Sequence, residues 1–511
     1  MSRQRQQKRE EEKNNDQNFV TDSVTDSVTD FFESCYDQEK KTLDFPIQWI
    51  QVSRKVGDDN FIQMLNNWIE ENKIPLPDIG HSREDAIKDF QKLIGVGALT
   101  PPKPLMRREG KGGKEGGREG KWSDSNYSGE EEYGTNMSLP LLSFSPWTHF
   151  LDYNSPPITF SLANFPNIKQ EMLSQEVQQP RQNMETKKGG SKGGVPPSLL
   201  IGISLSGNAC THYFNTPYRM KTQGLKNKSV EQIWGDKVCR RRALNMLKTK
   251  AKYNRSVNSA AFLNILMNYG CSATNFKPSV AKTIYQMFGA KKIYDFSAGW
   301  GDRLIAALAT PGVELYVGTD PNTNNHPLYD SILKTLDEPS EQLISQYKIP
   351  NSNNSQRRTE ACLHFLRAED FYPAEIYGQN FDLVFTSCPY FNLEQYAAKT
   401  DCEDDQCWKK YPEVEMWLNK FLFAALQNAI DCLRPGGILA INIADFVKTD
   451  KRTKLCEPMN RFLLSTKSCD YCGCIGMKLH KRYGNYIKDK SGVHAEPIWI
   501  WRKNLTAASY A

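Results

Sequence analysis

A glycine-containing turn in the second half of the chain has the residue types of a ligand-binding loop. Residues 295–303 read Asp-Phe-Ser-Ala-Gly-Trp-Gly-Asp-Arg, between a predicted strand and the helical stretch 304–308. Glycine at 299 and 301 lets the backbone approach a ligand closely, and the following helix offers unpaired N–H donors at its start. Ser297 occupies the first glycine position of the dinucleotide pattern G-x-G-x-x-G, and the turn lacks a P-loop lysine, so phosphate binding is disfavoured.

A second polar group follows the next predicted strand, 315–319, where Asp320 and Asn322 come directly after the apolar run. An acidic side chain at this place can accept hydrogen bonds from both hydroxyls of a ribose that is bound across neighbouring strand ends. The two strand ends together favour a nucleoside-bearing cofactor. A lone glycine turn and a lone strand-end aspartate are each also common in purely structural roles.

A third group, Ser387-Cys388-Pro389-Tyr390, follows the apolar strand predicted at 381–386. A glycine turn, a strand ending in aspartate and a strand ending in Ser-x-Pro-Tyr together resemble the class I methyltransferases. The likeness is strongest to the amino-methyltransferases whose fourth strand ends in (Asp/Asn/Ser)-Pro-Pro-(Tyr/Phe/Trp), in particular to uncharacterised phage and large-virus methylases with Ser-Ala-Gly-Trp-Gly-Asp-Arg. The resemblance covers residues 270–505.

The order of the other segments supports this resemblance. Asn275–Val280 precedes the glycine turn, as the cofactor-flanking segment does in the family. Leu433–Gly437 precedes a predicted strand, as in class I domains generally, and His494–Trp499 resembles the closing strand pair of the family.

The resemblance implies an enzyme that uses S-adenosyl-L-methionine to methylate the exocyclic amino group of adenine or cytosine in DNA. Such an amine is a poor nucleophile, because its lone pair is delocalised into the ring, so acceptors must draw its hydrogens into a reactive geometry. By resemblance, Ser387 and the Cys388 carbonyl orient the amine, Pro389 shapes the turn, and Tyr390 stacks on a flipped base. The implied cofactor-binding residues are Asp295, Ser297, Gly299, Gly301, Asp320, Asn322, Glu369, Asp370 and Phe276.

The cysteines allow two further interpretations. Cys388 replaces the first proline of the usual motif, and a thiolate nucleophile is disfavoured there because ring-carbon methyltransferases have the order Pro-Cys rather than Cys-Pro. A zinc site built from Cys469, Cys472 and Cys474 with Cys402 and Cys407 is also disfavoured, because the spacing is irregular. We expect reduced cysteines, no metal and an intracellular, reducing compartment, since the first residues do not resemble a secretory signal.

A basic segment precedes the methyltransferase-like region. Residues 219–255 contain twelve Lys and Arg against two acids, whereas the whole chain has a net charge of only +6. Basic and aromatic side chains together favour a nucleic-acid partner, with DNA favoured over RNA, although a solvated helix face remains an alternative. The residues predicted to bind nucleic acid are Arg219, Lys221, Arg240, Arg241, Arg242, Lys248 and Lys250.

Apolar runs of strand length alternate with helix-length segments from residue 292 onward. This alternation predicts an α/β, Rossmann-like class I methyltransferase domain with a mainly parallel sheet, and the absence of long apolar runs predicts a soluble chain without membrane contact. A mixed, partly disordered amino-terminal extension is expected before it. The predicted division is a disordered tail at 1–40, a small helical region at 41–100, a linker at 101–135, an ordered segment at 136–170, a second linker at 171–198, a basic helical nucleic-acid-binding region at 199–270 and the methyltransferase domain at 271–505.

Other functions stay open from the residues alone. RNA could replace DNA, a protein glutamine amide could be the acceptor, and Cys388 makes a non-catalytic nucleic-acid-binding homologue possible. Candidates for reading a target sequence are residues 200–270, 322–367 and 394–415.

Overall fold

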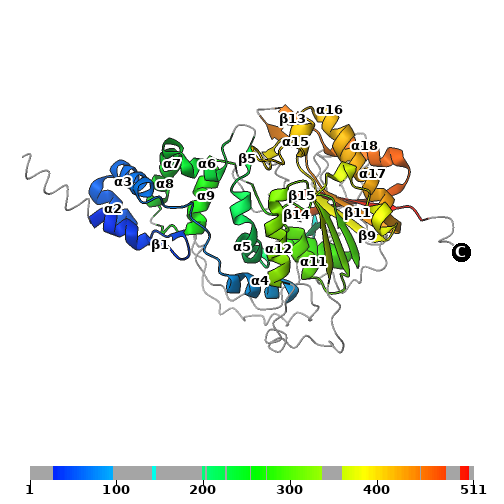
Figure 1. The fold of residues 1–511 in the computed structure, drawn as a ribbon, viewed down its shortest axis with the longest axis horizontal. Helices are drawn as coiled ribbons and strands as arrows, with labels where there is room; N and C mark the ends of the chain where they lie inside the picture. Colours follow the sequence, from blue (N-terminus) through cyan, green and yellow to red (C-terminus); the bar gives the residue numbers. More distant parts are fainter. Residues whose placement is uncertain are drawn as a thin grey trace, which may run out of the picture.

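The computed structural model describes residues 27–95, 141–144, 198–201, 204–224, 227–253, 255–271, 273–336, 359–448, 451–478 and 495–505. Figure 1 shows a group of helices at one end of the molecule and a sheet covered by helices at the other. We refer to the first as the helical body and to the second as the sheet domain.

A nine-stranded sheet is the centre of the sheet domain. Its spatial order is β3-β4-β14-β15-β11-β9-β6-β7-β8, and β15 runs antiparallel between β14 and β11. The strands are β3 (Leu141–Phe144), β4 (Ser198–Ile201), β6 (Lys292–Asp295), β7 (Leu315–Thr319), β8 (Glu360–His364), β9 (Phe381–Ser387), β11 (Leu433–Asn442), β14 (Cys469–Lys478) and β15 (Ala495–Lys503).

Five adjacent strands give the sheet its doubly wound topology. The parallel strands β8, β7, β6, β9 and β11 begin in the middle with β6 and grow toward both edges, so the order reverses between β6 and β9. In such sheets ligands bind outside the carboxyl ends of the strands at this reversal. The predicted α/β, Rossmann-like architecture with a mainly parallel sheet is therefore confirmed. Strand β8 lies inside the stretch 322–367, where the sequence did not indicate a strand.

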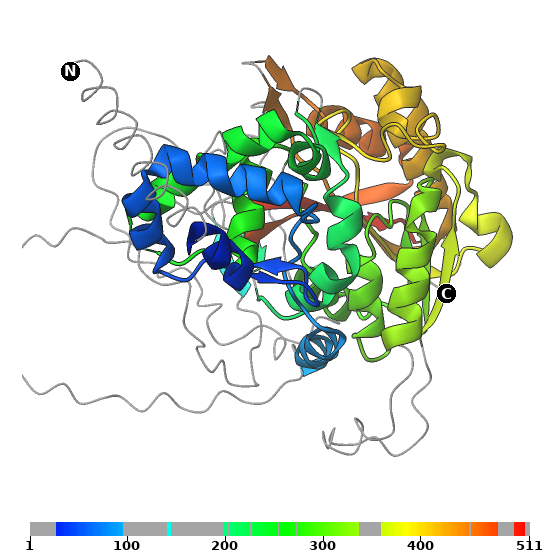
Figure 2. The ribbon, with the colours of Figure 1, turned by 60° about the vertical axis from the view of Figure 1, so that its left-hand side comes forward.

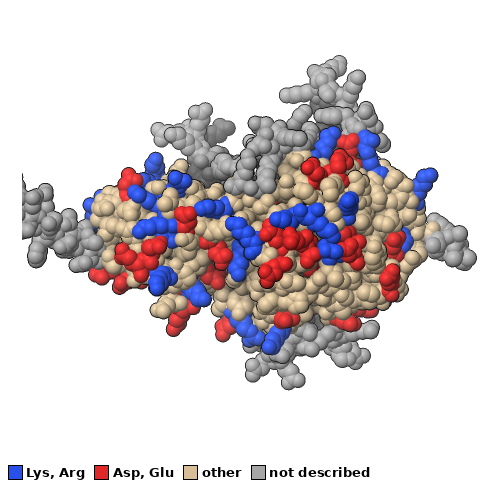
Figure 3. Space-filling view, turned by 45° about the horizontal axis from the view of Figure 1, so that its top comes forward, with Lys and Arg blue, Asp and Glu red and all other residues tan. Residues whose placement is uncertain are grey.

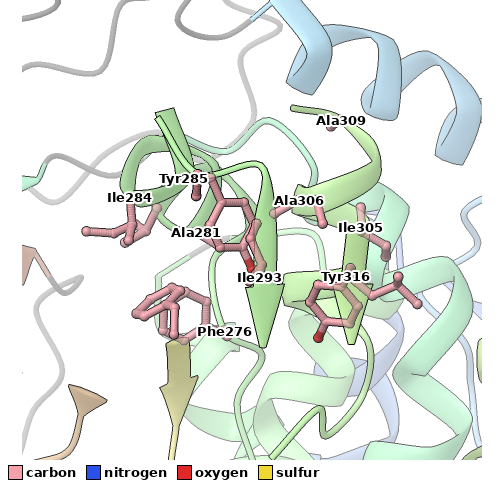
Figure 4. Close-up of a cluster of buried hydrophobic side chains, with 14 of the residues drawn as sticks. Phe276, Ala281, Ile284, Tyr285, Ile293, Ile305, Ala306, Ala309 and Tyr316 are labelled. Atoms are coloured by element: carbon pink, nitrogen blue, oxygen red, sulfur yellow. The ribbon is translucent and has the colours of Figure 1, made fainter. Parts of the chain in front are cut away.

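Alternate strand residues supply the two cores of the sheet domain. Ile293 of β6 and Tyr316 of β7 face one cluster with α10 and α11, whereas Tyr294 and Val317 face the other with α17 and α18. Figure 4 shows side chains of the first cluster converging from α10, β6, α11 and β7. The covering helices are α10 (Pro278–Met287), α11 (Asp302–Leu308), α12 (His326–Leu336), α17 (Phe423–Cys432) and α18 (Cys456–Thr466), with the π-helix η5 (Trp417–Leu422) before α17.

Two helices before residue 271 also belong to the sheet domain. The helices α4 (Arg83–Gly95) and α5 (Asn208–Arg219) contribute Leu93 and Phe214 to the first core cluster. Figure 1 places α4 beside α5 and α12, apart from the other early helices. The predicted boundary at 271 therefore cuts off part of this domain.

The helical body combines two regions that were predicted to be separate. Helices from residues 27–71 and from 230–269 share one hydrophobic cluster, and Figure 2 shows these blue and green helices packed together. Besides the helix at 27–35, they are α2 (Trp49–Val56), α3 (Asp58–Glu71), α6 (Val230–Gly235), α7 (Lys237–Leu244), α8 (Leu247–Ala251) and α9 (Ser259–Tyr269). Val28 and Phe32 are buried in this cluster, so the predicted disordered tail was wrong for residues 27–40.

Short elements complete the described chain. They are β1 (Tyr36–Asp37), β2 (Thr42–Leu43), β5 (Gln223–Gly224), η3 (Thr323–Asn325), η4 (Ala368–Asp370), α14 (Pro373–Tyr377), β10 (Glu394–Gln395), α15 (Cys407–Lys410), α16 (Val414–Met416), β12 (Phe446–Lys448) and β13 (Lys451–Thr453). None of the described helices has the length and apolar composition needed to cross a membrane. Within the same residues the thirteen cysteines are free, and His, Cys, Asp and Glu side chains form no group that could hold a metal ion.

A buried ion pair connects the end of β6 to the first turn of α11. Arg303 Nε donates to Asp295 Oδ2 at 2.7 Å, and both side chains are nearly inaccessible to solvent. The Tyr316 hydroxyl donates to the same carboxylate oxygen at 2.7 Å, and Arg303 also donates to the carbonyl of Ser297. These contacts hold the two ends of the glycine turn together.

Replacing Arg303 by Met should lower the free energy of unfolding by about 3–5 kcal/mol, because Asp295 would remain as a buried charge without its partner. Arg434 provides a matched control, since its Nε also lies 2.7 Å from an aspartate oxygen, that of Asp382, but its side chain is half exposed. Arg434→Met should cost about 1 kcal/mol or less. Urea denaturation of both variants measures the difference, and equal losses would contradict the structural role given to the buried pair.

Candidate functional site

A large cavity lies at the carboxyl ends of β6, β7 and β9, where the strand order reverses. Its volume is about 1650 Å³, and it is lined by Ser297, Asp320 and Ser387 from the sheet domain and by Met246 and Asn264 from the helical body. Single-ligand sites usually have about 300–1,000 Å³. The cavity therefore has room for two ligands side by side.

The glycine turn presents backbone to this cavity at Gly299. Gly299 has φ +59°, its N–H donates to Asp320 Oδ2 at 2.8 Å, and its carbonyl accepts from Asn325 Nδ2 at 3.0 Å. A Cβ added at Gly299 would meet only the Ser297 carbonyl, at 3.7 Å, so the space beside it is open. Ser297 and Gly299 line the cavity, as expected for residues that contact a ligand.

Two predicted cofactor residues of the same turn have structural roles instead. A Cβ at Gly301 would lie 2.6 Å from Ile332 Cδ1, so glycine is needed there for the packing of α12. Asp295 is fully buried in its ion pair with Arg303. Neither residue lines the cavity, so their predicted contact with a ligand stays a prediction.

The carboxylate of Asp320 lies at the end of β7 and lines the cavity. Its two oxygens accept from the backbone N–H groups of Gly299 and Asn322, each at 2.8 Å. Burial raises the pKa of Asp320 to about 6, against the lowering effect of these two hydrogen bonds. Each carboxylate oxygen can accept a second hydrogen bond, so the group can still bind two ligand hydroxyls.

Asn322 connects the β7 loop to the segment after the Ser387 motif. Its Oδ1 accepts from Asn324 N at 3.2 Å and from Cys402 Sγ at 3.3 Å. Asn324 Nδ2 in turn lies 3.3 Å from Thr400 Oγ1. Asn322 lines the cavity, and these hydrogen bonds fix its side chain within the loop.

Glu369 and Asp370, in the loop after β8, have different surroundings. Glu369 is buried, lines the cavity and accepts from the Tyr411 hydroxyl at 3.0 Å, and burial raises its pKa. Asp370 is half exposed, forms an ion pair with Arg367 and does not line the cavity. Asn428 Nδ2 donates to the carbonyls of Ala368, Glu369 and Phe371 and so sets the shape of this loop.

Phe276 covers the turn from the side of α10. It lines the cavity, its ring lies 5.3 Å from the guanidinium carbon of Arg303, and it packs edge-on against Phe385. Its predicted contact with a cofactor stays a prediction.

The hydroxyl of Ser387 is oriented by the neighbouring strand β11. Ser387 Oγ donates to Asn442 Oδ1 at 3.0 Å, while Asn442 Nδ2 donates to the carbonyl of Pro497 at 3.0 Å. The second bond fixes the amide, so its oxygen faces Ser387. The hydrogen of the serine is thereby occupied, and the remaining lone pairs of Oγ can accept hydrogens from a ligand in the cavity.

The rest of the motif forms the floor of the same cavity. The hydroxyl of Tyr390 donates to Glu496 on β15, which fixes the ring, and Pro389 lines the cavity beside it. Phe391 has φ +52°, a strained conformation for a residue with a side chain, and its ring packs against Trp417 of the π-helix η5. Strain of this kind persists only where the surroundings enforce it.

Cys388 is a buried thiol. Only 2% of the residue is exposed, and burial raises its pKa well above the usual value. A thiolate is therefore strongly disfavoured at physiological pH, which argues against a nucleophilic role.

The predicted basic surface is divided by the fold. Arg240 is buried, where it donates to Asn66 Oδ1 at 2.8 Å and pairs with Glu70, and Arg219 is buried and donates to the carbonyl of Ala273 at 2.9 Å. Neither side chain therefore belongs to an exposed basic surface, and Arg219 lines the cavity instead. Lys221, Arg241 and Arg242 are exposed, Lys248 pairs with Asp59, and Lys250 is half-buried. Figure 3 shows basic and acidic side chains interspersed on the face in view.

Sequence reasoning missed Asn442, Glu496 and Asn428, which position the motif and the β8 loop. Asn442 ends an apolar strand, and the polar residue at that place was the available signal. Glu496 lies 106 positions along the chain from Tyr390, to which it is hydrogen-bonded. Asn428 lies 59 positions from Glu369 and 57 from Phe371, whose carbonyls accept from its side chain. The sequence pattern does not show such partners.

No protein-family model and no curated protein matches the chain. Among solved structures it is similar to TrmN from Thermus thermophilus (11% identity, TM-score 0.28, 46% of this chain and 51% of that one). It is also similar to an O-methyltransferase from Bacillus cereus in complex with SAH (13% identity, TM-score 0.27, 45% of this chain and 84% of that one). A further similar structure is a SAM-dependent O-methyltransferase from Thermotoga maritima (11% identity, TM-score 0.25, 47% of this chain and 70% of that one). The match spans about half of the TrmN chain.

Alkylation of the folded protein with iodoacetamide at pH 8 should modify Cys388 far more slowly than the partly exposed Cys362, because Cys388 is buried and protonated. Peptide mass spectrometry of timed samples gives the order of modification. Early modification of Cys388 would restore the nucleophile hypothesis.

Proposed function

We propose that this protein is an S-adenosylmethionine-dependent methyltransferase that acts on the exocyclic amino group of adenine or cytosine in DNA. The observation that carries the proposal is the orientation of Ser387, whose hydrogen is donated to Asn442 while its lone pairs remain available at the cavity. An amine acceptor needs this arrangement, and a hydroxyl that had to donate toward the ligand would not provide it.

The residues of the first half of the cavity fit the cofactor. Asp320 offers two carboxylate oxygens for ribose hydroxyls, the open space beside Gly299 admits close approach of a ligand to the backbone, and Glu369 and Phe276 line the walls. S-adenosylmethionine supplies an activated methyl group on its sulfonium, and its reactivity requires little beyond positioning from the protein.

The motif residues would prepare the acceptor. Ser387 Oγ and the carbonyl of Cys388 each accept one hydrogen of the amine, which turns the nitrogen lone pair out of conjugation and toward the methyl carbon. If S-adenosylmethionine is bound, it would supply the methyl group to this nitrogen with cleavage of its own S–C bond, and the surplus proton of the amine would pass to solvent. Tyr390, fixed through Glu496, offers a ring on which a flipped base can stack.

Three alternatives share parts of this site. A glutamine amide on a protein could use the same two acceptors, and RNA carries the same amino groups as DNA. A non-catalytic homologue is the third, because Cys388 replaces a proline. Against it, the Ser387 hydroxyl donates its hydrogen to Asn442 and so leaves its lone pairs available at the cavity.

The direct test incubates the full-length protein with S-adenosylmethionine and separately with DNA, RNA and a protein extract, followed by mass spectrometry of nucleosides and amino acids. We expect methylated adenine or cytosine from DNA. Ser387→Ala should lower turnover by about a hundredfold while the affinity for S-adenosylhomocysteine stays unchanged, because the serine acts on the acceptor only. Methylated nucleosides from RNA alone, methylglutamine, or no product despite cofactor binding would each contradict the proposal.

The affinity for S-adenosylhomocysteine should fall as the pH is lowered through about 6, because only the ionised Asp320 can accept two ribose hydroxyls. For one group with this pKa, binding at pH 5 is about tenfold weaker than at pH 7. Isothermal calorimetry across this range measures the effect. Asp320→Asn should bind weakly without this pH dependence.

Asp302→Asn is the matched control, because Asp302 also lines the cavity and burial raises its pKa to about 7. The Asp302→Asn variant should still lose affinity for S-adenosylhomocysteine as the pH is lowered through about 6. Loss of this pH dependence in Asp302→Asn and its retention in Asp320→Asn would overturn the assignment.

A further inference from the structure

The helical body contributes one wall of the cavity that also contains the Ser387 motif. Its helix α9 contributes Asn264 and Asn268, and the connection between α7 and α8 contributes Met246. We propose that this wall recognises the acceptor nucleic acid, with the two α9 amides reading base edges and Arg242 and Lys250 contacting phosphates. This inference rests on the proposed function.

The two α9 amides are placed for hydrogen bonding to a ligand. Asn264 and Asn268 are four residues apart, so they lie on one face of the helix, and both are exposed and line the cavity. Within the described residues neither side chain has a hydrogen-bond partner, whereas Asn258 at the start of the same helix caps Ala261 N. Asparagine is the side chain that pairs with the N6 and N7 atoms of adenine through two hydrogen bonds.

The other side of α9 explains why this face is held rigidly. Phe262, Leu263 and Leu266 are buried in the core that the helical body shares between its early and late helices. Asn264 and Asn268 are therefore polar positions on a helix that is otherwise anchored by apolar contacts. A rigid helix is a precise platform for contacts to a ligand.

The basic residues of α7 and α8 separate into two faces. Backbone hydrogen bonds continue through Asn245 and Met246, so residues 242, 246 and 250 follow one another at helical spacing on one face. Arg242 and Lys250 thus flank Met246, which lines the cavity. Lys248 instead pairs with Asp59, and Arg241 is close enough to lower the pKa of that same carboxyl.

The pairing of β5 with β10 supports a single acceptor site between the helical body and the Ser387 motif. β5, just after α5, pairs antiparallel with β10, only a few residues after the Ser387 motif, and Gly224 and Glu394 of this pair both line the cavity. The chain that leads from α5 into the helical body is thus paired with the segment that follows Tyr390. A cavity of about 1650 Å³ leaves room for a base beside the cofactor.

The test uses the full-length protein, a labelled DNA oligonucleotide and two matched pairs of variants. Asn264→Ala with Asn268→Ala should raise the KM for the oligonucleotide about tenfold or more and alter base or sequence preference, while kcat and the affinity for S-adenosylhomocysteine stay unchanged. Asn245→Ala, an exposed asparagine nearby that does not line the cavity, should have no effect. Thermal unfolding confirms that each variant is folded.

The arginine pair tests the phosphate contact. Arg242→Ala should reduce the magnitude of the slope of log affinity against log salt concentration by about 0.9, the contribution of one phosphate contact. Arg241→Ala should leave the slope unchanged. Fluorescence anisotropy at several salt concentrations measures both slopes. Equal behaviour of the two arginine variants, or an unchanged KM in the double asparagine variant, would overturn the inference. Failure of the proposed function is distinguishable, because then the wild-type protein itself would transfer no methyl group to the oligonucleotide.

Discussion

The buried contact between Asp295 and Arg303 is the interaction on which the site depends. It joins the end of the central strand β6 to the start of α11, and the same guanidinium holds the Ser297 carbonyl and lies beside Phe276. The turn between them can then place Gly299 against Asp320 of the next strand. A buried charge without its partner is strongly destabilising, so Asp295 and Arg303 must stay in contact once both are buried.

From this centre the other loops are connected by side-chain amides. Asn428 holds the β8 loop, Asn442 orients Ser387, and Asn322 joins the β7 loop to the segment after the motif through Cys402. In each case an amide satisfies backbone or side-chain groups that would otherwise be buried without a partner. Hydrogen bonds of these amides thus hold the loops of the proposed cofactor and acceptor parts of the cavity in fixed positions. A reaction that depends on the positioning of two ligands requires such an arrangement.

The strands β6, β7, β9 and β11 could be predicted because each contains an apolar run of strand length, and the motif residues could be located because they directly follow such runs, whereas β8 was not indicated. Side-chain partners could not be predicted, because Arg240 meets Glu70 from 170 residues away and becomes a core residue despite lying in a basic run. Gly301 likewise looks like a ligand-binding glycine in sequence, whereas only the packing of Ile332 reveals its role. The composition shows that residues 219–255 are basic, but the burial of each side chain determines whether its charge is available to a ligand.

The most direct test of the account is a crystal structure of the protein with S-adenosylhomocysteine. In the proposed site, one cavity holds the cofactor at Asp320 with its sulfur facing Ser387. We predict both ribose hydroxyls within hydrogen-bond distance of the Asp320 carboxylate, at about 2.5–3.0 Å, and the sulfur facing the Ser387 hydroxyl. A cofactor bound elsewhere, or bound in this cavity with its sulfur directed away from Ser387, would contradict the account.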